Sequence, residues 1–270
     1  MNSAPKLVVP PKLVVTDMDG TLLGRDGLVS ARNAAALRRA QEAGAKVLIA
    51  TGRPVWWLDP VRQAGFAGTA VCMNGAMVYH VGDGEVLAAS PLSAETLNAF
   101  TEAFTAEVPG AAIAVERLGT EQIDSWSEAH YDHPWDEGSF EVQARSELLA
   151  QPAIKMLVRY GNDSSALAAV AAGLGVPGVS ITYSTDAGLI EVMAGGVNKG
   201  VTVARLAQEW GIDPADAVAF GDMPNDIEML QWAGRSYAME GAHTQALAAA
   251  TDQAGRHDED GVAQVLERWF

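Results

Sequence analysis

Short runs of β-branched and aliphatic residues alternate with segments of helical periodicity in the first third of the chain. The runs and the helical segments between them occupy, in order, residues 12–16, 31–43, 46–50, 56–64 and 69–73. Such apolar runs are typical of strands buried on both faces, and their alternation with helices is typical of a parallel sheet. A further run at 217–220, followed by a helical segment at 227–232, fits the same sheet. The predicted fold class is therefore α/β, with a doubly wound parallel sheet.

The pattern changes in the middle of the chain. Amphipathic helical segments at 94–107 and 164–174 are mixed there with an alternating strand at 154–159. This change predicts a second α/β unit inserted into the first. The expected division is a core in two parts with an α/β cap domain between them, at residues 1–88, 89–194 and 195–270.

Composition restricts the class of partner and the compartment. The 270 residues carry 34 acidic against 18 basic side chains, a formal charge of −16 that disfavours nucleic acid and acidic membranes as partners. The single cysteine, Cys72, excludes an internal disulfide and is typical of a reducing compartment. Pro10 and Pro11 interrupt the N-terminal apolar stretch, so we expect no signal peptide or membrane span. These features predict a cytoplasmic protein without a nucleic-acid or membrane partner, and they leave the oligomeric state open.

Polar residues follow three of the predicted strands at the point where each strand ends. They are Asp17 and Asp19, then Thr51, Gly52 and Arg53, then Asp222, Asn225 and Asp226. Ligands bind at the carboxyl ends of the strands in open parallel sheets, so the fold would bring four carboxylates into one crevice. Like charges at close range require a cation or a proton, and an all-oxygen cluster suits Mg²⁺. Lys199, before a predicted helix, could add a further positive group.

Structural alternatives exist for each of these residues. Acidic residues and glycines are common in ordinary turns, and Asn225 and Asp226 could simply cap a helix. An EF-hand at 17–20 is excluded because its glycine falls at the fourth position of the loop and not at the sixth. Arg53 could equally be a surface residue or a substrate contact, and Asn74 is expected to be a turn residue that faces the site.

The order and composition of the polar segments resemble the haloacid dehalogenase (HAD) superfamily. The resemblance is to the Cof-like phosphatase branch, whose α/β cap is inserted between the second and third motifs. The matching segments are DMDGTLL at 17–23, ATGR at 50–53, NGA at 74–76, NKG at 198–200, GDMPND at 221–226 and DGVA at 260–263. The resemblance implies a HAD-like Rossmannoid core with an inserted cap.

The resemblance also implies a catalytic pair and a metal site. Asp17 would be the nucleophile that becomes an aspartyl-phosphate, a known covalent use of a carboxylate. Asp19 would protonate the leaving alcohol and later deprotonate water. Mg²⁺ would be held by Asp17, the backbone carbonyl of Asp19 and Asp222, and Asp226 would orient this metal site.

The remaining motif residues would then bind the phosphoryl group. Thr51 and the backbone amide of Gly52 would contact its oxygens, together with Asn225. Lys199 would pair with the same group and with the nucleophile. Pre-placed donors of this kind are needed because phosphoryl transfer depends on positioning and charge stabilisation.

Substrate choice is expected to lie in the cap. The aromatic and polar stretch from 126 to 140 is interpreted as a loop or an irregular edge of the cap. Trp126, His130, His133 and Trp135 are its candidate contacts to the leaving group. The alternative is that these side chains only pack the loop or lie on its surface. In the core, Met223 stands where the family more often has asparagine, which leaves the proposed mechanism intact.

The sequence therefore predicts a magnesium-dependent hydrolase of phosphomonoesters that acts on a small metabolite, expected to be a sugar phosphate, through an aspartyl-phosphate. Two alternatives stay open. A phosphomutase or phosphotransferase would return the phosphoryl group from the same intermediate to an alcohol. A non-catalytic sensor would bind a phosphorylated metabolite without turnover.

Overall fold

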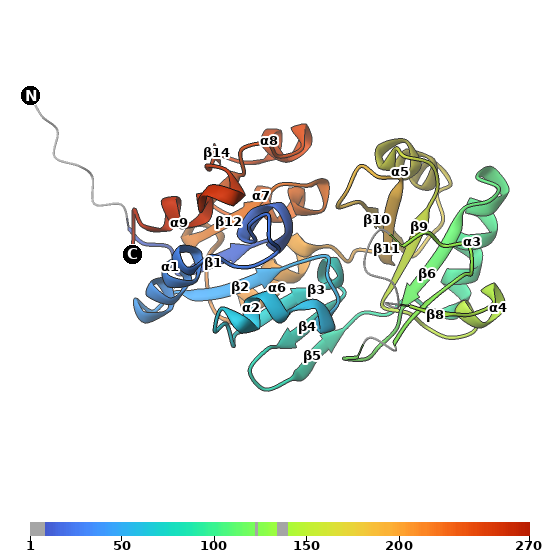
Figure 1. Cartoon of the computed structure of the whole chain (residues 1–270), viewed down its shortest axis with the longest axis horizontal. Coiled ribbons are helices and arrows are strands. Elements are labelled where there is room, and N and C mark those ends of the chain that lie inside the picture. Colours follow the sequence, from blue (N-terminus) through green and yellow to red (C-terminus); the bar gives the residue numbers. More distant parts are fainter. Residues whose placement is uncertain (1–8, 122–123, 134–139) are drawn as a thin grey trace, which may run out of the picture.

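Two β-sheets organise the chain (Figure 1). The structure is a computed structural model that describes residues 9–121, 124–133 and 140–270. The strands of the larger sheet are β1 (Leu13–Thr16), β2 (Lys46–Ala50), β3 (Thr69–Cys72), β4 (Met77–His80), β5 (Glu85–Ala89), β12 (Ala217–Gly221), β13 (Arg235–Ala238) and β14 (Asp252–Gln253). Within the described residues this sheet has eight strands, in the order β14-β13-β12-β1-β2-β3-β4-β5.

Six of these strands, from β14 to β3, run parallel, and β1 lies between β12 and β2. This arrangement confirms the predicted parallel sheet. β4 and β5 extend it as an antiparallel hairpin next to β3. The turn at Met73–Gly75 reverses the chain there, and Met73 and Asn74 both adopt positive φ angles.

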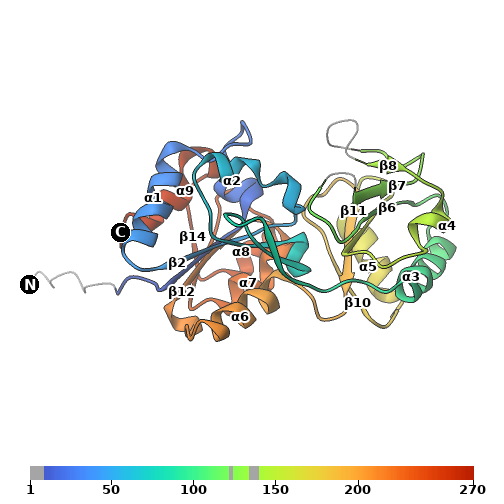
Figure 2. The same ribbon diagram turned by 90° about the horizontal axis from the view of Figure 1, so that it is seen from below.

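Helices cover both faces of the larger sheet (Figure 2). They are α1 (Ala31–Glu42), α2 (Asp59–Gln63), α6 (Lys199–Glu209), α7 (Ile227–Trp232), α8 (Thr244–Ala249) and α9 (Gly261–Leu266). Strand residues alternate between the two faces, so that Val14 packs in one apolar cluster with α1, α2 and α9, and Val15 packs in the other with α6, α7 and α8. The sheet is therefore doubly wound, as the sequence predicts.

The inserted cap has its own sheet. Its strands are β6 (Ala112–Glu116), β7 (Ser125–Ser127), β8 (Glu141–Val142), β9 (Lys155–Arg159), β10 (Val179–Thr182) and β11 (Leu189–Ala194), and its helices are α3 (Ala94–Glu107), α4 (Arg145–Leu148) and α5 (Ser164–Gly173). The strand order among the described residues is β10-β11-β9-β6-β7-β8. The domain boundaries at 88/89 and 194/195 stay predictions.

The two faces of the cap sheet differ. Phe100 and Phe104 of α3 and Leu167 of α5 pack on one face, against side chains such as Val158. The other face carries a smaller apolar cluster that includes Leu157. Because side chains alternate along a strand, the residues on this second face are available for contacts with the core.

One local prediction was wrong in its bounds, and another was confirmed. The helix expected at 56–64 is a short 3₁₀ turn, Val55–Trp57, followed by α2. Pro60 lies in the first turn of α2, where its missing N–H is tolerated, whereas it could not lie inside a longer helix. The second of the two structures expected around Trp126, an irregular edge of the cap, was confirmed: Trp126 lies in β7, paired with Val115 of β6 and next to the edge strand β8.

Ser30 and Cys72 show two further local features of the core domain. Ser30 caps α1, because its Oγ accepts a hydrogen bond from the Asn33 amide at 3.0 Å. Cys72 is fully buried in the core, and burial raises the pKa of its thiol to about 12. The thiol therefore acts as a small apolar group and not as a nucleophile.

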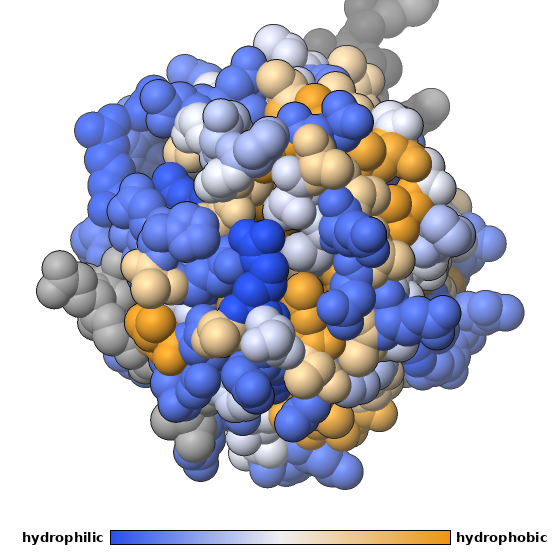
Figure 3. All heavy atoms as spheres, turned by 90° about the vertical axis from the view of Figure 1, so that its right-hand side faces the viewer, coloured by the Kyte–Doolittle hydropathy of each residue, from blue (hydrophilic) through white to orange (hydrophobic). Residues whose placement is uncertain are grey.

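Among the described residues, no helix is long and apolar enough to cross a membrane. The end of the molecule formed by the cap is largely hydrophilic, with small separate hydrophobic areas (Figure 3). In the part of the cap that the structure describes, the exposed large apolar side chains are Leu118, Val142, Tyr160 and Val170. Scattered apolar residues of this kind are ordinary on a protein surface.

Candidate active site

The carboxyl ends of three adjacent strands form the candidate site. Asp17 follows β1, Thr51 follows β2 and Asp222 follows β12. Backbone hydrogen bonds extend the sheet to these positions, since the Asp17 amide donates to the Phe220 carbonyl at 3.0 Å and the Thr51 amide to the Val71 carbonyl at 2.8 Å. The sheet register thus brings together the polar segments that the sequence places at strand ends.

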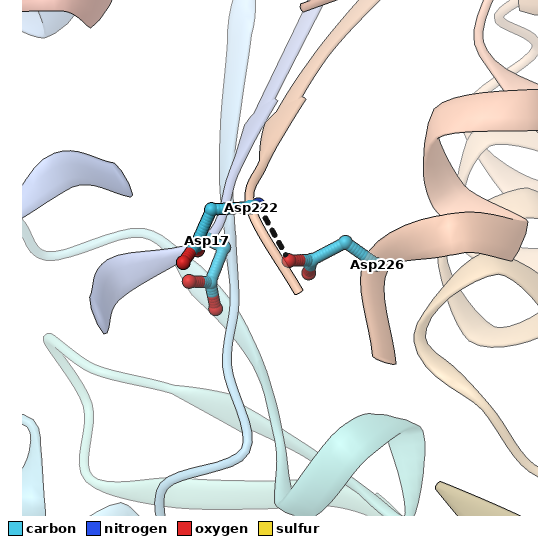
Figure 4. A group of neighbouring side chains, drawn as sticks. All are labelled: Asp17, Asp222 and Asp226. Carbon is cyan, nitrogen blue, oxygen red and sulfur yellow. Dashed lines mark hydrogen bonds between the residues drawn. The ribbon is translucent and has the colours of Figure 1, made fainter. Parts of the chain in front are cut away.

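An acidic cluster lies at this edge of the sheet (Figure 4). Asp17, Asp222 and Asp226 each offer a carboxylate oxygen, and these atoms lie within 4.8 Å of one another. Figure 4 shows the Asp17 and Asp222 side chains close together, with Asp226 reaching the Asp222 amide from the start of α7. An all-oxygen donor set of this kind fits a hard divalent cation.

Lys199 balances part of this negative charge. Its ammonium is fully buried, 2.6 Å from Oδ1 of Asp17 and 2.7 Å from Oδ1 of Asp226. The other oxygen of Asp226 accepts hydrogen bonds from the amides of Asp222 and Met223, at 3.0 and 3.1 Å. Both oxygens of Asp226 are thus used within the protein, whereas Asp17 and Asp222 keep oxygens that could bind a cation.

The pKa values show how strongly the cluster favours added positive charge. Burial raises the pKa of Asp17 well above its usual range, and the neighbouring aspartates raise it further, although Lys199 opposes them. Burial and Asp226 raise the pKa of Asp222 to about 7 against the effects of Thr21 and Lys199. For Lys199, burial alone would lower the pKa, but the carboxylates of Asp17 and Asp226 raise it, so the ammonium stays charged. A bound cation would lower both aspartate pKa values.

Gly20 and Thr21 hold Asp222 in place, and the sequence analysis missed their contacts. The hydroxyl of Thr21 donates to Oδ1 of Asp222 at 2.9 Å. Gly20 has φ +71°, and a Cβ there would lie 2.3 Å from Oδ2 of Asp222. Only glycine permits both this conformation and this close approach.

Asp19 lies beside the cluster and pairs with Arg53. The guanidinium donates from Nε and Nη2 to the two Asp19 oxygens at 2.8 and 2.6 Å, and its Nη1 donates to the Trp57 carbonyl at 3.2 Å. The Asp19 side chain is 59% exposed, unlike the buried Asp17. Arg53, for which the sequence left two roles open, therefore fixes the orientation of Asp19.

A second group of polar residues lies around Gly52, next to the acidic cluster. Thr51 is fully buried, and its hydroxyl accepts a hydrogen bond from the Arg53 amide at 3.1 Å. Nδ2 of Asn225 donates to Oδ1 of Asn74 at 2.9 Å. Among the described residues, Nδ2 of Asn74 and Oδ1 of Asn225 are buried without a hydrogen-bond partner. Each side-chain amide therefore keeps one polar atom that could bind a ligand. Asn74 is a turn residue, as expected, and its side chain also bonds to Asn225.

The alternative of a simple helix cap is wrong for Asn225 and only partly correct for Asp226, whose side chain accepts from the Met223 amide in a capping box of the 3₁₀ helix Pro224–Asp226. The Asn225 side chain bonds to Asn74, and the Asp226 side chain makes no capping hydrogen bond to α7. Asp226 accepts instead from the two amides at the preceding turn. Its position orders the segment that presents Asp222.

The cap candidates named from the sequence make contacts within the cap. His133 Nε2 lies 3.1 Å from the Ser127 hydroxyl, and its ring packs on Tyr131. The ring of Trp126 lies 4.3 Å from the guanidinium carbon of Arg117. His130 is more than half exposed, and Trp135 lies outside the described residues. Packing thus explains what the structure shows of Trp126 and His133.

A different cap residue contacts the core. The ammonium of Lys155, the first residue of β9, lies 2.7 Å from the carbonyl oxygen of Gly52. Two buried cap glutamates, Glu116 and Glu191, lie beside it at 3.0 and 3.1 Å. The sequence analysis missed these residues, although a lysine at the start of a buried apolar strand was a usable signal.

Known proteins resemble this chain over nearly its whole length. A family model of haloacid dehalogenase-like hydrolases matches residues 14–266. The chain is 26% identical over 280 residues to the 5-amino-6-(5-phospho-D-ribitylamino)uracil phosphatase YitU of Bacillus subtilis (strain 168), covering 96% of this chain and 98% of that protein. It is 29% identical over 265 residues to the HMP-PP phosphatase of Cronobacter sakazakii (strain ATCC BAA-894), covering 96% of each.

A solved structure agrees with these sequence relatives. The protein SMU.1108c from Streptococcus mutans UA159 superimposes with a TM-score of 0.82 at 26% identity, over 95% of this chain and 98% of that one. The fold, the order of the motifs and the family match are consistent with one another. The chain belongs to the haloacid dehalogenase-like hydrolases, in their Cof-like branch of phosphatases with an inserted α/β cap.

Proposed function

We propose that this phosphatase is a magnesium-dependent hydrolase of small phosphomonoesters, with a sugar phosphate as substrate, and that it works through an aspartyl-phosphate on Asp17. The observation that carries the proposal is the buried ammonium of Lys199 between Asp17 and Asp226, next to Asp222. A nucleophilic carboxylate must be ionised and fixed in direction. The Lys199 ammonium favours both, since it holds Oδ1 of Asp17 and opposes the rise in pKa that burial causes.

Asp17 and Asp222, with the backbone carbonyl of Asp19, would hold Mg²⁺. The ion would neutralise the repulsion between the phosphate and the carboxylates when it is bound. The support is the oxygen donor set and the raised pKa values of Asp17 and Asp222, which indicate a deficit of positive charge. Asp226 would act indirectly, by fixing the Asp222 backbone and Lys199.

The chain's own residues then divide the reaction into two steps. An oxygen of Asp17 forms a bond to phosphorus while the bond to the leaving oxygen breaks, and Asp19 gives that oxygen a proton. A water molecule next attacks phosphorus, Asp19 takes back a proton, and the bond to Asp17 breaks to release inorganic phosphate. Thr51, the Gly52 amide, Lys199 and Asn225 would hold the phosphoryl oxygens in both steps.

The substrate class draws support from a relative. The Bacillus subtilis protein is named for a substrate whose phosphate is on a ribityl chain, which is a polyol. A hydroxylated metabolite of similar size is therefore a reasonable substrate for this chain. A cytoplasmic location also stays a proposal, based on the single buried cysteine.

Phosphate release tests the proposal. The wild-type chain and Asp17→Asn would be incubated with an aryl phosphate and a panel of sugar phosphates, with and without Mg²⁺. Asp252→Asn, an exposed change on β14, is the matched control. We expect magnesium-dependent release by the wild type and the control, and none above background by Asp17→Asn.

Two results would contradict this proposal. Full activity in Asp17→Asn would exclude Asp17 as the nucleophile. No phosphate from any substrate, with the protein folded and Mg²⁺ bound, would exclude hydrolysis of this class. In that case transfer to an added sugar would point to a phosphotransferase, and a stable complex with an intact phosphorylated metabolite would point to a sensor.

A further inference from the structure

Three ionisable side chains share the helix-free face of the cap sheet. They are Glu116 on β6, Lys155 on β9 and Glu191 on β11. The residues next to them in sequence, such as Met156, belong to the apolar cluster beneath α3 and α5. Since successive side chains of a strand point to opposite faces, the three charged residues lie on the face away from the helices. We call them the cap triad.

The cap triad is buried and joined to the core. Each of its residues is at most 3% exposed. The Lys155 ammonium lies 3.0 Å from Oε2 of Glu116, 3.1 Å from Oε1 of Glu191 and 2.7 Å from the Gly52 carbonyl oxygen. The Gly52 carbonyl oxygen and Oε1 of Glu191 accept hydrogen bonds from this ammonium, and Glu116 is its ion-pair partner. Burial would lower the pKa of Lys155, but the two glutamates raise it, so this residue stays charged.

Glu191 lies directly beside the loop that is proposed to bind phosphate. A Cβ placed on Gly52 would be 3.4 Å from Oε1 of Glu191, and the same point is 3.1 Å from Oδ1 of Asn74. A group bonded to a phosphate at the Gly52 amide would therefore begin close to Glu191. The cap triad thus adjoins the position expected for the leaving alcohol.

One carboxylate oxygen of Glu191 has no donor. Oε2 is buried without a hydrogen-bond partner among the described residues, and so is the hydroxyl of the nearby Tyr131. Buried polar atoms are nearly always hydrogen-bonded in folded proteins, and a buried anionic oxygen is especially unfavourable when it is not. The missing partner is explained if a ligand supplies it. Lys155 donates to the other oxygen of this carboxylate, Oε1.

We propose that Glu191 is a specificity-determining residue, whose Oε2 accepts a hydrogen bond from a hydroxyl of the leaving alcohol and whose charge rejects leaving groups that carry a carboxylate. The preferred substrates are thus phosphate esters of neutral polyhydroxy alcohols. Lys155 holds Glu191 against the Gly52 carbonyl and so sets its position. This inference rests on the proposed function, because it requires phosphate to bind at the Gly52 loop.

Two variants separate the contact from the charge. Glu191→Gln keeps the size and can still accept a hydrogen bond, but it removes the charge. Glu191→Asp keeps the charge, but the shorter side chain withdraws the oxygen. Each is assayed for kcat/KM with a panel of neutral sugar phosphates and with 2-phosphoglycolate, whose leaving group carries a carboxylate.

The expected results differ between the variants. In Glu191→Gln, the ratio of kcat/KM for 2-phosphoglycolate to that for the best sugar phosphate rises about tenfold or more. In Glu191→Asp, kcat/KM for that sugar phosphate falls about tenfold, while 2-phosphoglycolate stays a poor substrate. Glu128→Gln is the matched control, because Glu128 is also a buried cap glutamate in an ion pair, with Arg145 at 2.7 Å. Its ratio should equal that of the wild type.

Failure of this inference is distinguishable from failure of the proposed function. If the wild type hydrolyses sugar phosphates with dependence on Asp17, but the Glu191→Gln ratio stays within twofold of the wild-type value, only the role of Glu191 is overturned. If the wild type releases no phosphate at all, the proposed function itself fails. Thermal melting confirms that each variant is folded. If Glu191→Gln does not fold, Glu191→Asp is a sufficient test. An unchanged kcat/KM for the sugar phosphate in this variant would then overturn the proposed role of Glu191.

Discussion

The Nζ atom of Lys199 lies 2.6 Å from Oδ1 of Asp17, although 182 positions separate the two residues in the sequence. Neither side chain is open to solvent, since Lys199 is fully buried and Asp17 is 5% exposed. A buried ion pair of this kind is unfavourable to break, because removal of one partner leaves an uncompensated charge. Lys199 is therefore required for stability as well as for the proposed chemistry.

Lys199→Met should reduce both activity and stability. Loss of a pre-placed cation beside the nucleophile is expected to lower kcat by about 10²–10³-fold. The buried carboxylates of Asp17 and Asp226 would lose their partner, which should lower the free energy of unfolding by about 3–5 kcal/mol. Urea denaturation and phosphate release measure the two effects.

Lys12→Met provides the control for the Lys199 substitution. Lys12 also pairs with an aspartate, Asp216, at 2.8 Å, but its side chain is 65% exposed. This change should leave the unfolding midpoint and the activity nearly unaltered, because exposed ion pairs contribute little. If Lys12→Met and Lys199→Met lowered the free energy of unfolding equally, burial would not explain the contribution of the Lys199 ion pairs.

Magnesium affinity should depend on pH through the acidic cluster. In the metal-free protein the pKa of Asp222 is raised to about 7, so Mg²⁺ must displace a proton below that pH. We expect binding at pH 6 to be about tenfold weaker than at pH 8. Isothermal titration calorimetry at several pH values measures the affinity. An affinity for Mg²⁺ that is the same at pH 6 and pH 8 would exclude competition between the ion and the Asp222 proton.

The same raised pKa affects the stability of the metal-free protein. Asp222 takes up a proton in the folded state up to about pH 7, but in the unfolded chain only near its usual pKa of 3.8. The stabilisation that this proton uptake gives the folded state is therefore complete below pH 3.8 and is lost as the pH rises through about 7. Added Mg²⁺ should raise the melting temperature more at pH 8 than at pH 6, and Asp222→Asn should remove this difference.

Gly20→Ala should disturb the metal site specifically. The new Cβ would lie 2.3 Å from Oδ2 of Asp222, so that carboxylate must move. We expect the affinity for Mg²⁺ and the rate of phosphate release to fall by about 10–100-fold. Gly27→Ala is a close control, because Gly27 has a similar φ of +74° and nothing within 4 Å of its Cβ position. Both variants should lose about 1–2 kcal/mol of stability from the left-handed backbone, but only Gly20→Ala should lose metal affinity.

Arg53→Ala should lower kcat more than it raises KM. Arg53 fixes Asp19 through two hydrogen bonds, and a misplaced acid–base group is expected to slow the reaction by about 10–100-fold. Arg53→Lys should restore only part of the rate, since an ammonium cannot form the paired contact. Arg62→Ala, which removes an ion pair with Asp59 at 3.2 Å, is the control. A purely structural role for Arg53 would instead appear as a lower melting temperature with an unchanged kcat.

Much of the fold can be predicted from local pattern. The bounds of β2, α3 and α7 coincide with segments predicted from periodicity alone. The polar residues follow the strands because ligands bind at the carboxyl ends of the strands in an open parallel sheet. These features depend on neighbours within a few positions, which is the range over which a sequence pattern is informative.

Contacts between distant segments were not predictable in the same way. Arg53 meets Asp19 across 34 positions, Lys155 meets Gly52 across 103, and Asn225 meets Asn74 across 151. The alternation in β9 places Lys155 and Met156 on opposite faces, but it does not say which face α3 and α5 cover. The packing of the cap decides this, and with it which cap residues reach the core.

The sequence by itself therefore determined the sheet, the strand-end motifs and the family resemblance, since each is recorded in short segments. The tertiary structure alone decided the pairing of Asp19 with Arg53, the burial of Lys199 and the position of the cap triad. The physical reason is that hydrogen bonds and ion pairs form wherever the packed chain brings charged groups together, and that proximity depends on the whole fold and not on the spacing of residues.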